Sequence, residues 1–207
     1  ELLEPDSVVA ISGGSTMAAV AEEMPILPFN PTVVPARGGV GAVVEYQANV
    51  IASVLAERLR GTYKMLHLPD GLSQDSLHML MTCEPQIKEI SDLISRTDVL
   101  LFGIGTAMRM ADQRHIADEV RKQLVDNHAV GEALGQYCDM DGKLIYSTNN
   151  IGLSLPDVAK VPNVIAVAGG QEKASAIIGV MRACQKGILI IDEQAAEGMR
   201  QLLQISA

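Results

Sequence analysis

The sequence predicts an α/β protein with a mostly parallel sheet and helices on both of its faces. Short apolar strands alternate along the chain with helical patterns. The strands are near-continuous runs of Val, Ile and Leu, which is typical of strands covered on both faces. The chain has 207 residues, 48% of them hydrophobic, so it can bury a substantial core. We therefore expect one domain over residues 1–207.

The predicted strands share this apolar character. They are Ser7–Ile11, Pro31–Pro35, Tyr63–Leu68, Asp98–Ile104, Asn163–Ala168 and Gly187–Ile191. No apolar run approaches the roughly 18–20 residues that a membrane span requires, so we expect no membrane partner.

The predicted helices lie between these strands, and the longest is Gly41–Arg60. The others are Thr16–Met24, Ser73–Met81, Pro85–Ser95, Ala117–Asp126, Glu172–Cys184 and Asp192–Leu203. The last begins with Asp192 and Glu193, acidic residues that suit the positive end of a helix.

One segment departs from this alternation. Gly135–Ser147 contains two short β-like runs around Asp141 and Gly142, and Asp-Gly is a strong hairpin signal. We expect a small peripheral β-hairpin there.

Charge and composition exclude several classes of function. The net charge is −9, from 16 basic and 25 acidic residues, whereas a duplex-binding surface needs clustered Lys and Arg. Aromatic residues are 3% of the chain, which argues against base stacking. The three cysteines are odd in number and widely spaced, so they form neither a disulfide framework nor a metal cluster. This pattern suits the reducing environment of the cytoplasm. The chain does not begin with Met, and we expect that an upstream part is missing.

Three apolar strands run into glycine-rich turns that precede helices: "ISGGST", "FGIGTA" and "AGGQEK". A helix N-terminus has unpaired N–H groups and attracts anions, and glycine lets a phosphate approach closely. Such a turn is also an ordinary capped connection, but three in one chain favour an anion site. None matches the P-loop or the full dinucleotide motif. The sequence therefore predicts a phosphorylated small molecule rather than ATP or NAD.

Three further polar residues are candidates for that site. Arg37 precedes several glycines and could clamp a phosphate, or it could be a solvated loop residue. Gln47 would lie two turns into the long helix, facing either the pocket or solvent. Glu132 could act as a general base or accept hydrogen bonds from sugar hydroxyls. The four histidines have no metal-binding spacing, and we expect no metal or cofactor.

Several segments together resemble the effector-binding domain of the SorC family of bacterial transcriptional regulators. They are "ISGGSTMAAVAE", "VPARGGVG", "YQANVIASVLAERLRGTY", "GIGTAM", "DNHAVGEALGQYCDMDGKLI" and "VIAVAGGQEKASAIIGVMRA", and they cover nearly the whole chain. "VPARGG" is similar to the branch that regulates central glycolytic genes.

The resemblance implies a fold similar to glucosamine-6-phosphate deaminase and ribose-5-phosphate isomerase. It also implies a homo-oligomer that binds operator DNA through an N-terminal helix-turn-helix domain absent from this chain. The effector would be a sugar phosphate, with fructose 1,6-bisphosphate expected for the glycolytic branch.

The resemblance also assigns effector-binding residues position by position. The first phosphate cradle would comprise Gly14, Ser15 and Thr16, and the second Gly169, Gly170 and Lys173. Arg37, Gln47 and Glu132 match further contact positions, and Arg114 matches the second of two adjacent arginines. Gln113 replaces the first of these.

Two other functions fit the same fold. One is a sugar-phosphate isomerase or deaminase, although no segment resembles the active sites of those enzymes. The other is an oligomerisation module whose pocket no longer binds a ligand.

Overall fold

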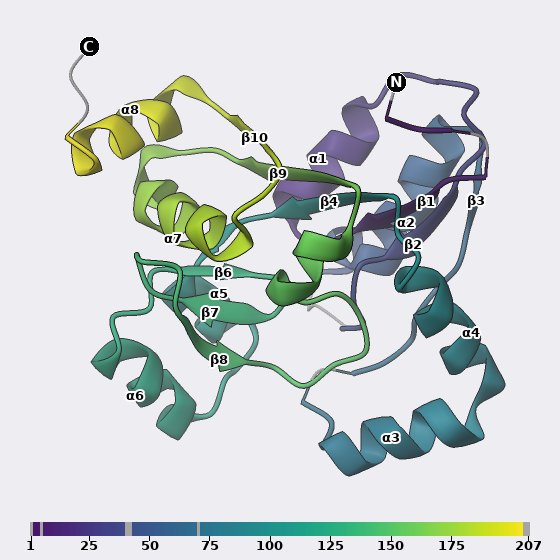
Figure 1. Cartoon of the computed structure of the whole chain (residues 1–207), viewed down its shortest axis with the longest axis horizontal. Coiled ribbons are helices and arrows are strands. Elements are labelled where there is room, and N and C mark those ends of the chain that lie inside the picture. Colours follow the sequence, from purple (N-terminus) through teal and green to yellow (C-terminus); the bar gives the residue numbers. More distant parts are fainter. Residues whose placement is uncertain (1, 5, 40–42, 70, 205–207) are drawn as a thin grey trace. The chain divides into compact units, whose positions relative to one another are not determined.

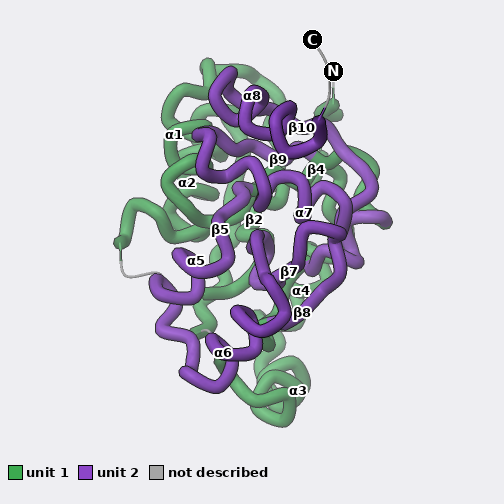
Figure 2. Tube along the Cα trace, turned by 90° about the vertical axis from the view of Figure 1, so that its left-hand side faces the viewer, with its two compact units in different colours: residues 1–102, 148–153, 160–164 green, residues 103–147, 154–159, 165–207 purple. Residues whose placement is uncertain are grey.

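The computed structural model describes residues 2–4, 6–39, 43–69 and 71–204. These residues form two compact units that alternate along the chain (Figure 2). Unit 1 contains residues 1–102, 148–153 and 160–164, and unit 2 contains residues 103–147, 154–159 and 165–207. A single effector-binding domain over residues 1–207 stays a prediction.

The predicted α/β class is confirmed (Figure 1). Six strands form a sheet in the order β10-β9-β4-β1-β2-β3, and every register given for its neighbouring strands is parallel. These strands are β1 Val8–Ile11, β2 Thr32–Pro35, β3 Thr62–Tyr63, β4 Val99–Gly103, β9 Asn163–Ala168 and β10 Ile188–Ile191.

Unit 1 is built on β1, whose four residues are all buried. Helices α1 (Ser15–Glu23) and α2 (Ala48–Arg58) pack against each other, and α2 also packs on β1 and β2. The buried face of α2 includes Ile51, Ala52 and Leu55. Burial of these apolar side chains is the main favourable contribution to the stability of the unit.

Two consecutive helices, α3 (Gln74–Cys83) and α4 (Pro85–Ile94), complete unit 1 and meet at an angle (Figure 1). Helix α3 begins where the Ser73 hydroxyl accepts a hydrogen bond from the Ser76 N–H, as an N-cap residue does. None of its residues is buried, whereas α4 packs on β1 and β2.

Unit 2 contains an antiparallel sheet in the order β5-β6-β7-β8. Its strands are β5 Gly105–Thr106, β6 Gly131–Ala133, β7 Gln136–Cys138 and β8 Leu144–Ser147. The predicted hairpin is confirmed as β7–β8, but it is not simply peripheral, because β7 is wholly buried and pairs with β6. Tyr137 of β7 belongs to a core cluster with Ala107, Ala111 and Leu124.

Unit 2 also contains helices and 3-10 turns. The helices are α5 Ala107–Gln113, α6 Asp118–Asp126, α7 Ala174–Cys184 and α8 Glu193–Leu202, with 3-10 turns at Leu155–Lys160 (η2) and Gln171–Lys173 (η3). Helix α7 packs on β6 and β7, and α8 packs on α7 and η3.

Two sequence predictions in unit 1 are wrong in extent. The expected strand Tyr63–Leu68 ends at Tyr63, because the Asn49 side chain bonds both the N–H and the carbonyl of Leu66. The expected helix Gly41–Arg60 begins only at Ala48, after a short 3-10 turn, Val44–Tyr46 (η1). Its predicted first two residues, 41 and 42, lie outside the described residues.

Candidate functional site

The first glycine turn links β1 to α1 in unit 1. Gly14 has φ +113°, and its N–H donates to the Tyr46 carbonyl at 2.9 Å. The first α-helical hydrogen bond runs from the Ala18 N–H to the Gly14 carbonyl. The N–H groups of Ser15, Thr16 and Met17 therefore precede the hydrogen-bonded ladder, as at every helix N-terminus. Ser15 is exposed and Thr16 is half-buried.

Gln47 lies beside this turn, but not where the sequence predicted. It is the N-cap residue of α2 rather than a residue two turns into a helix. A Cβ at Gly13 would lie 2.8 Å from the Tyr46 carbonyl oxygen and 3.3 Å from the Ala48 nitrogen. Glycine is therefore required at 13, and it brings the N-termini of α1 and α2 together. Both ends carry partial positive charge, so the pair can attract an anion.

Arg37 follows β2 and is only 6% exposed, so the alternative of a solvated loop arginine is wrong. Its Nη2 donates to the Thr148 hydroxyl at 2.8 Å. The backbone of Arg37 forms an antiparallel bridge with Gly152. A Cβ at Gly152 would lie 2.3 Å from the Arg37 Cα, so only glycine allows this approach. The segment 148–153 thereby fixes a buried guanidinium that stays charged.

Arg114 and Glu132 form an ion pair in unit 2. Nη2 of Arg114, at the C-terminus of α5, donates to Oε1 of Glu132, on β6, at 3.1 Å. The Gly135 N–H donates to the same oxygen at 2.6 Å. Glu132 is 3% exposed and the Arg114 side chain 22%. The two charges therefore largely compensate each other, and the carboxylate keeps acceptor capacity for further hydrogen bonds.

The third glycine turn joins β9 to η3 in unit 2. Gly170 has φ +98°, and its N–H donates to Oδ2 and Oδ1 of Asp192 at 2.9 and 3.1 Å. The same carboxylate accepts from the Ala195 N–H at 2.7 Å and caps α8. These two amides, and Lys173 less strongly, lower the pKa of Asp192. The predicted helix from Glu172 begins only at Ala174, because residues 171–173 form η3.

Sequence reasoning identified Asp192 as a helix-start residue but missed its bond to the Gly170 turn. The available signal was the parallel pairing of two predicted strands. Ile191 pairs with Ala168, so the residues that follow each strand lie side by side.

The middle glycine turn differs from the other two, so the expectation of three similar turns is wrong. Gly105 and Thr106 form β5, which pairs with Glu132 and Gly131 of β6. The Ala107 N–H, at the start of α5, donates to the Val130 carbonyl. A short strand therefore occupies the position where an open anion-binding turn was expected.

The predicted residues thus gather in separate groups. In unit 1, Gly14, Ser15 and Thr16 lie beside Gln47, and Arg37 is fixed by segment 148–153. In unit 2, Arg114 is paired with Glu132, and the turn Gly169–Gly170 that precedes Lys173 is bonded to Asp192. Among the described residues, no cluster of three or more His, Cys, Asp or Glu side chains could hold a metal ion.

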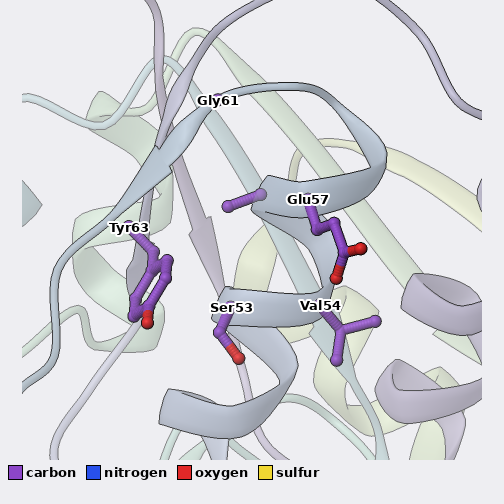
Figure 3. Close-up of a pocket in the computed structure, with 6 residues that line it drawn as sticks. Ser53, Val54, Glu57, Gly61 and Tyr63 are labelled. Atoms are coloured by element: carbon purple, nitrogen blue, oxygen red, sulfur yellow. The ribbon is translucent and has the colours of Figure 1, made fainter.

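Unit 1 has a surface hollow on α2 (Figure 3). It is lined by the second half of α2, including Ser53 and Glu57, and by Gly61 and Tyr63. The Ser53 hydroxyl donates to the Val50 carbonyl of its own helix. The hollow contains none of the predicted site residues.

In the described part of the chain, no helix is long and apolar enough to cross a membrane.

The fold and these side chains can be compared with known proteins. A family model described as "Putative sugar-binding domain" matches residues 1–201. The chain belongs to the SorC sugar-binding domain family. The crystal structure of a "putative SorC family transcriptional regulator" from Enterococcus faecalis matches this SorC domain with a TM-score of 0.87 and 38% identity, covering 95% of this chain and 81% of that one. The full-length sorbitol operon regulator of Klebsiella pneumoniae shares the fold, with a TM-score of 0.83 and 23% identity, over 96% of this chain and 66% of that one.

Two curated relatives of this SorC domain are named central glycolytic genes regulator. The protein of Bacillus subtilis (strain 168) is 40% identical over 92% of this chain and 56% of its own length. That of Priestia megaterium is 40% identical over 95% of this chain and 58% of its own length. The SorC domain therefore spans little more than half the length of these relatives.

Proposed function

We propose that this SorC domain is the effector sensor of a cytoplasmic transcriptional regulator, a repressor of central glycolytic genes, and that its effector is a phosphorylated sugar. Fructose 1,6-bisphosphate is the first candidate. The observation that carries the proposal is the pair of helix N-termini, α1 and α2, beside Gly14 and Gln47. The names of the two glycolytic regulators support the choice of effector.

The chemistry of a phosphate suits the groups in unit 1. Phosphate oxygens only accept hydrogen bonds while the group is a dianion, and the start of α1 offers N–H donors together with the hydroxyls of Ser15 and Thr16. Arg37 supplies a buried cation that matches phosphate geometry.

Unit 2 supplies a second set of groups. Lys173 offers an ammonium after the Gly169–Gly170 turn, and the Glu132 carboxylate can accept hydrogen bonds from sugar hydroxyls. We propose that Arg114 acts through Glu132 by holding this carboxylate in place.

In the complete regulator, we propose that operator DNA is bound by a helix-turn-helix domain beyond this chain, whose net charge of −9 does not suit DNA contact. The effector would bind one subunit arrangement of a homo-oligomer more tightly than another. Through this difference, effector binding would change the affinity of the oligomer for operator DNA.

An enzyme on the same fold is the alternative function, because a fold alone does not determine activity. An isomerase or deaminase would need a group that moves a proton between neighbouring carbons. The curated relatives named above are regulators rather than enzymes, which favours the sensor.

A thermal-shift series tests the sensor against the enzyme. The panel is fructose 1,6-bisphosphate, fructose 6-phosphate, glucose 6-phosphate, inorganic phosphate and unphosphorylated fructose. We expect the bisphosphate to raise the melting temperature, because a ligand at 100 times its Kd stabilises the native state by about 2.7 kcal/mol. No shift with any sugar phosphate would contradict the proposal. Turnover of a sugar phosphate, followed by NMR, would support the enzyme instead.

A further inference from the structure

We propose that Asp192 is a positioning residue for anion binding in unit 2, because it holds the Gly169–Gly170 turn in the conformation that presents Lys173. This inference rests on the proposed function. It concerns a residue that follows β10 and would not itself touch the effector.

Asp192 ties together two segments that are far apart in sequence. Its carboxylate accepts the Gly170 N–H at 2.9 and 3.1 Å and the Ala195 N–H at 2.7 Å. The first amide belongs to the turn after β9, and the second to the start of α8. Hydrogen bonds between a carboxylate and backbone amides are charge-assisted and about twice as strong as neutral ones. The bond therefore fixes the turn to a helix that is itself packed on η3 and α7.

The turn is built to accept this carboxylate closely. A Cβ at Gly169 would lie 2.7 Å from Oδ2 of Asp192, so residue 169 has to be glycine for the contact to form. Gly170 has φ +98°, a conformation that residues with a side chain rarely adopt. Both glycines thus allow the turn to bind Asp192.

The conformation of Gly170 is transmitted to Lys173 through η3. The Lys173 N–H donates to the Gly170 carbonyl at 3.1 Å, and Lys173 is also the N-cap residue of α7. A change at Gly170 would therefore move the lysine. The ammonium and the Asp192 carboxylate also attract each other, since Lys173 contributes to the lowered pKa of Asp192.

Asp192 could have the opposite effect, because a carboxylate near a bound phosphate also repels it. The two possibilities predict changes of opposite sign. Removing a positioning group weakens effector binding, whereas removing a repelling charge tightens it.

Calorimetric titration of fructose 1,6-bisphosphate into the full chain, four single variants and one double variant tests the inference. We expect Asp192→Ala to raise the Kd about tenfold, the low end of the range seen when a partner that orients a metal ligand is removed, because Asp192 is exposed. Asp192→Asn should raise it less, because the amide oxygen still accepts a hydrogen bond. The matched control is Glu193→Gln, which removes a neighbouring charge at the same helix start and should leave the Kd within about twofold, as is usual for exposed charges. Lys173→Ala provides the background for a double-mutant cycle.

The cycle separates a positioning role from a merely structural one. If Asp192 acts through the turn, Asp192→Ala should have little further effect in the Lys173→Ala background. Hydrogen exchange of the Gly170 amide should also become faster in Asp192→Ala.

Three results would overturn the inference alone, provided that the wild type binds the effector. They are tighter binding by Asp192→Ala, an unchanged Kd, and an equal loss with and without Lys173. Failure of the wild-type chain to bind any sugar phosphate would instead overturn the proposed function, and this inference with it.

Discussion

The glycine turns after β1 and β9 have the same sequence character but different hydrogen-bond partners. In unit 1, the Gly14 N–H donates to a backbone carbonyl, that of Tyr46. In unit 2, the Gly170 N–H donates to the carboxylate of Asp192. Both partners come from segments more than twenty residues away, so the turn sequence alone does not determine them. The partner nevertheless decides how much negative charge lies beside each turn.

The arginines of the two units differ in the same way. Arg37 in unit 1 donates to the Thr148 hydroxyl, which is neutral, whereas Arg114 in unit 2 donates to the Glu132 carboxylate. A hydroxyl satisfies a donor without cancelling its charge, and a carboxylate does both. Arg114 and Glu132 are therefore an internal charge pair of unit 2.

The largest effect is expected from Arg114→Ala, which breaks an internal charge pair of unit 2. Glu132 would remain buried without its cation, and breaking a buried pair in this way lowers the free energy of unfolding by about 3–5 kcal/mol. We expect the lower end of this range, because the Arg114 side chain is 22% exposed. Urea denaturation measures the change.

The matched control is Lys88→Ala, which removes the cation of the exposed pair Lys88–Asp92. Exposed pairs contribute about 0–1 kcal/mol. Equal losses from Arg114→Ala and Lys88→Ala would show that the buried pair does not stabilise unit 2 as the comparison requires.

The second prediction concerns effector binding in unit 1. Arg37→Ala should weaken binding of fructose 1,6-bisphosphate by about 1.5–3 kcal/mol, the range for a hydrogen bond to a charged group. The exposed Arg96 provides the control variant, Arg96→Ala, which should bind normally. Calorimetry below the unfolding transition measures both. An unchanged affinity in Arg37→Ala would place this guanidinium outside the site.

The third prediction compares the two turns directly. A Cβ at Gly13 would lie nearest to backbone atoms of Tyr46 and Ala48, whereas the three atoms nearest to a Cβ at Gly169 belong to the Asp192 side chain. Gly13→Ala should therefore lower the free energy of unfolding by about 1–3 kcal/mol, as overpacking does. Gly169→Ala should cost less, because a side chain can rotate away.

A double variant sharpens this comparison. In an Asp192→Ala background the contact at Gly169 is removed, so Gly169→Ala should cost less there than in the wild type, by more than the roughly 0.5 kcal/mol within which independent sites add. If the cost persists, something other than Asp192 requires glycine there.

Local pattern predicted most of the fold. Apolar runs located every strand of the parallel sheet, and the Asp141-Gly142 signal located the β7–β8 hairpin. Prediction from local pattern failed where contacts with segments distant in sequence determine the structure. The 3-10 turn η1 interrupts the predicted helix, and its Tyr46 carbonyl accepts the Gly14 N–H from more than thirty residues away. No signal within α2 indicates this bond.

Candidate site residues were identifiable by type, but their partners were not. Arg37 looked like an exposed residue or a clamp, and its burial depends on segment 148–153. Glu132 was not expected on a strand, because Gly131–Ala133 is only three residues long and is stabilised by pairing on both sides. The effector-binding roles of these residues stay predictions.

The smallest predicted effect is a pH dependence that only the unit 2 turn should show. The amides of Ala195 and Gly170 lower the pKa of Asp192 in the native state, relative to about 3.9 in an unfolded chain. The group's contribution to stability is therefore present above about pH 4 and is lost as the pH falls through the native-state pKa. The turn at Gly14 has a backbone carbonyl as its partner and cannot contribute in this way.

Urea denaturation of the wild type and Asp192→Asn at pH 5, 4 and 3 tests this difference. The wild type should be the more stable at pH 5, and the gap should narrow toward pH 3, because protonation removes from the wild type the charge that the variant already lacks. Glu197, whose pKa is lowered to about 2 by Arg200, titrates in both proteins and cancels in the comparison. If the difference in free energy of unfolding between the two proteins stays constant from pH 5 to pH 3, the Asp192 charge does not stabilise the native turn. The turns after β1 and β9 would then not differ in whether a charged partner stabilises them.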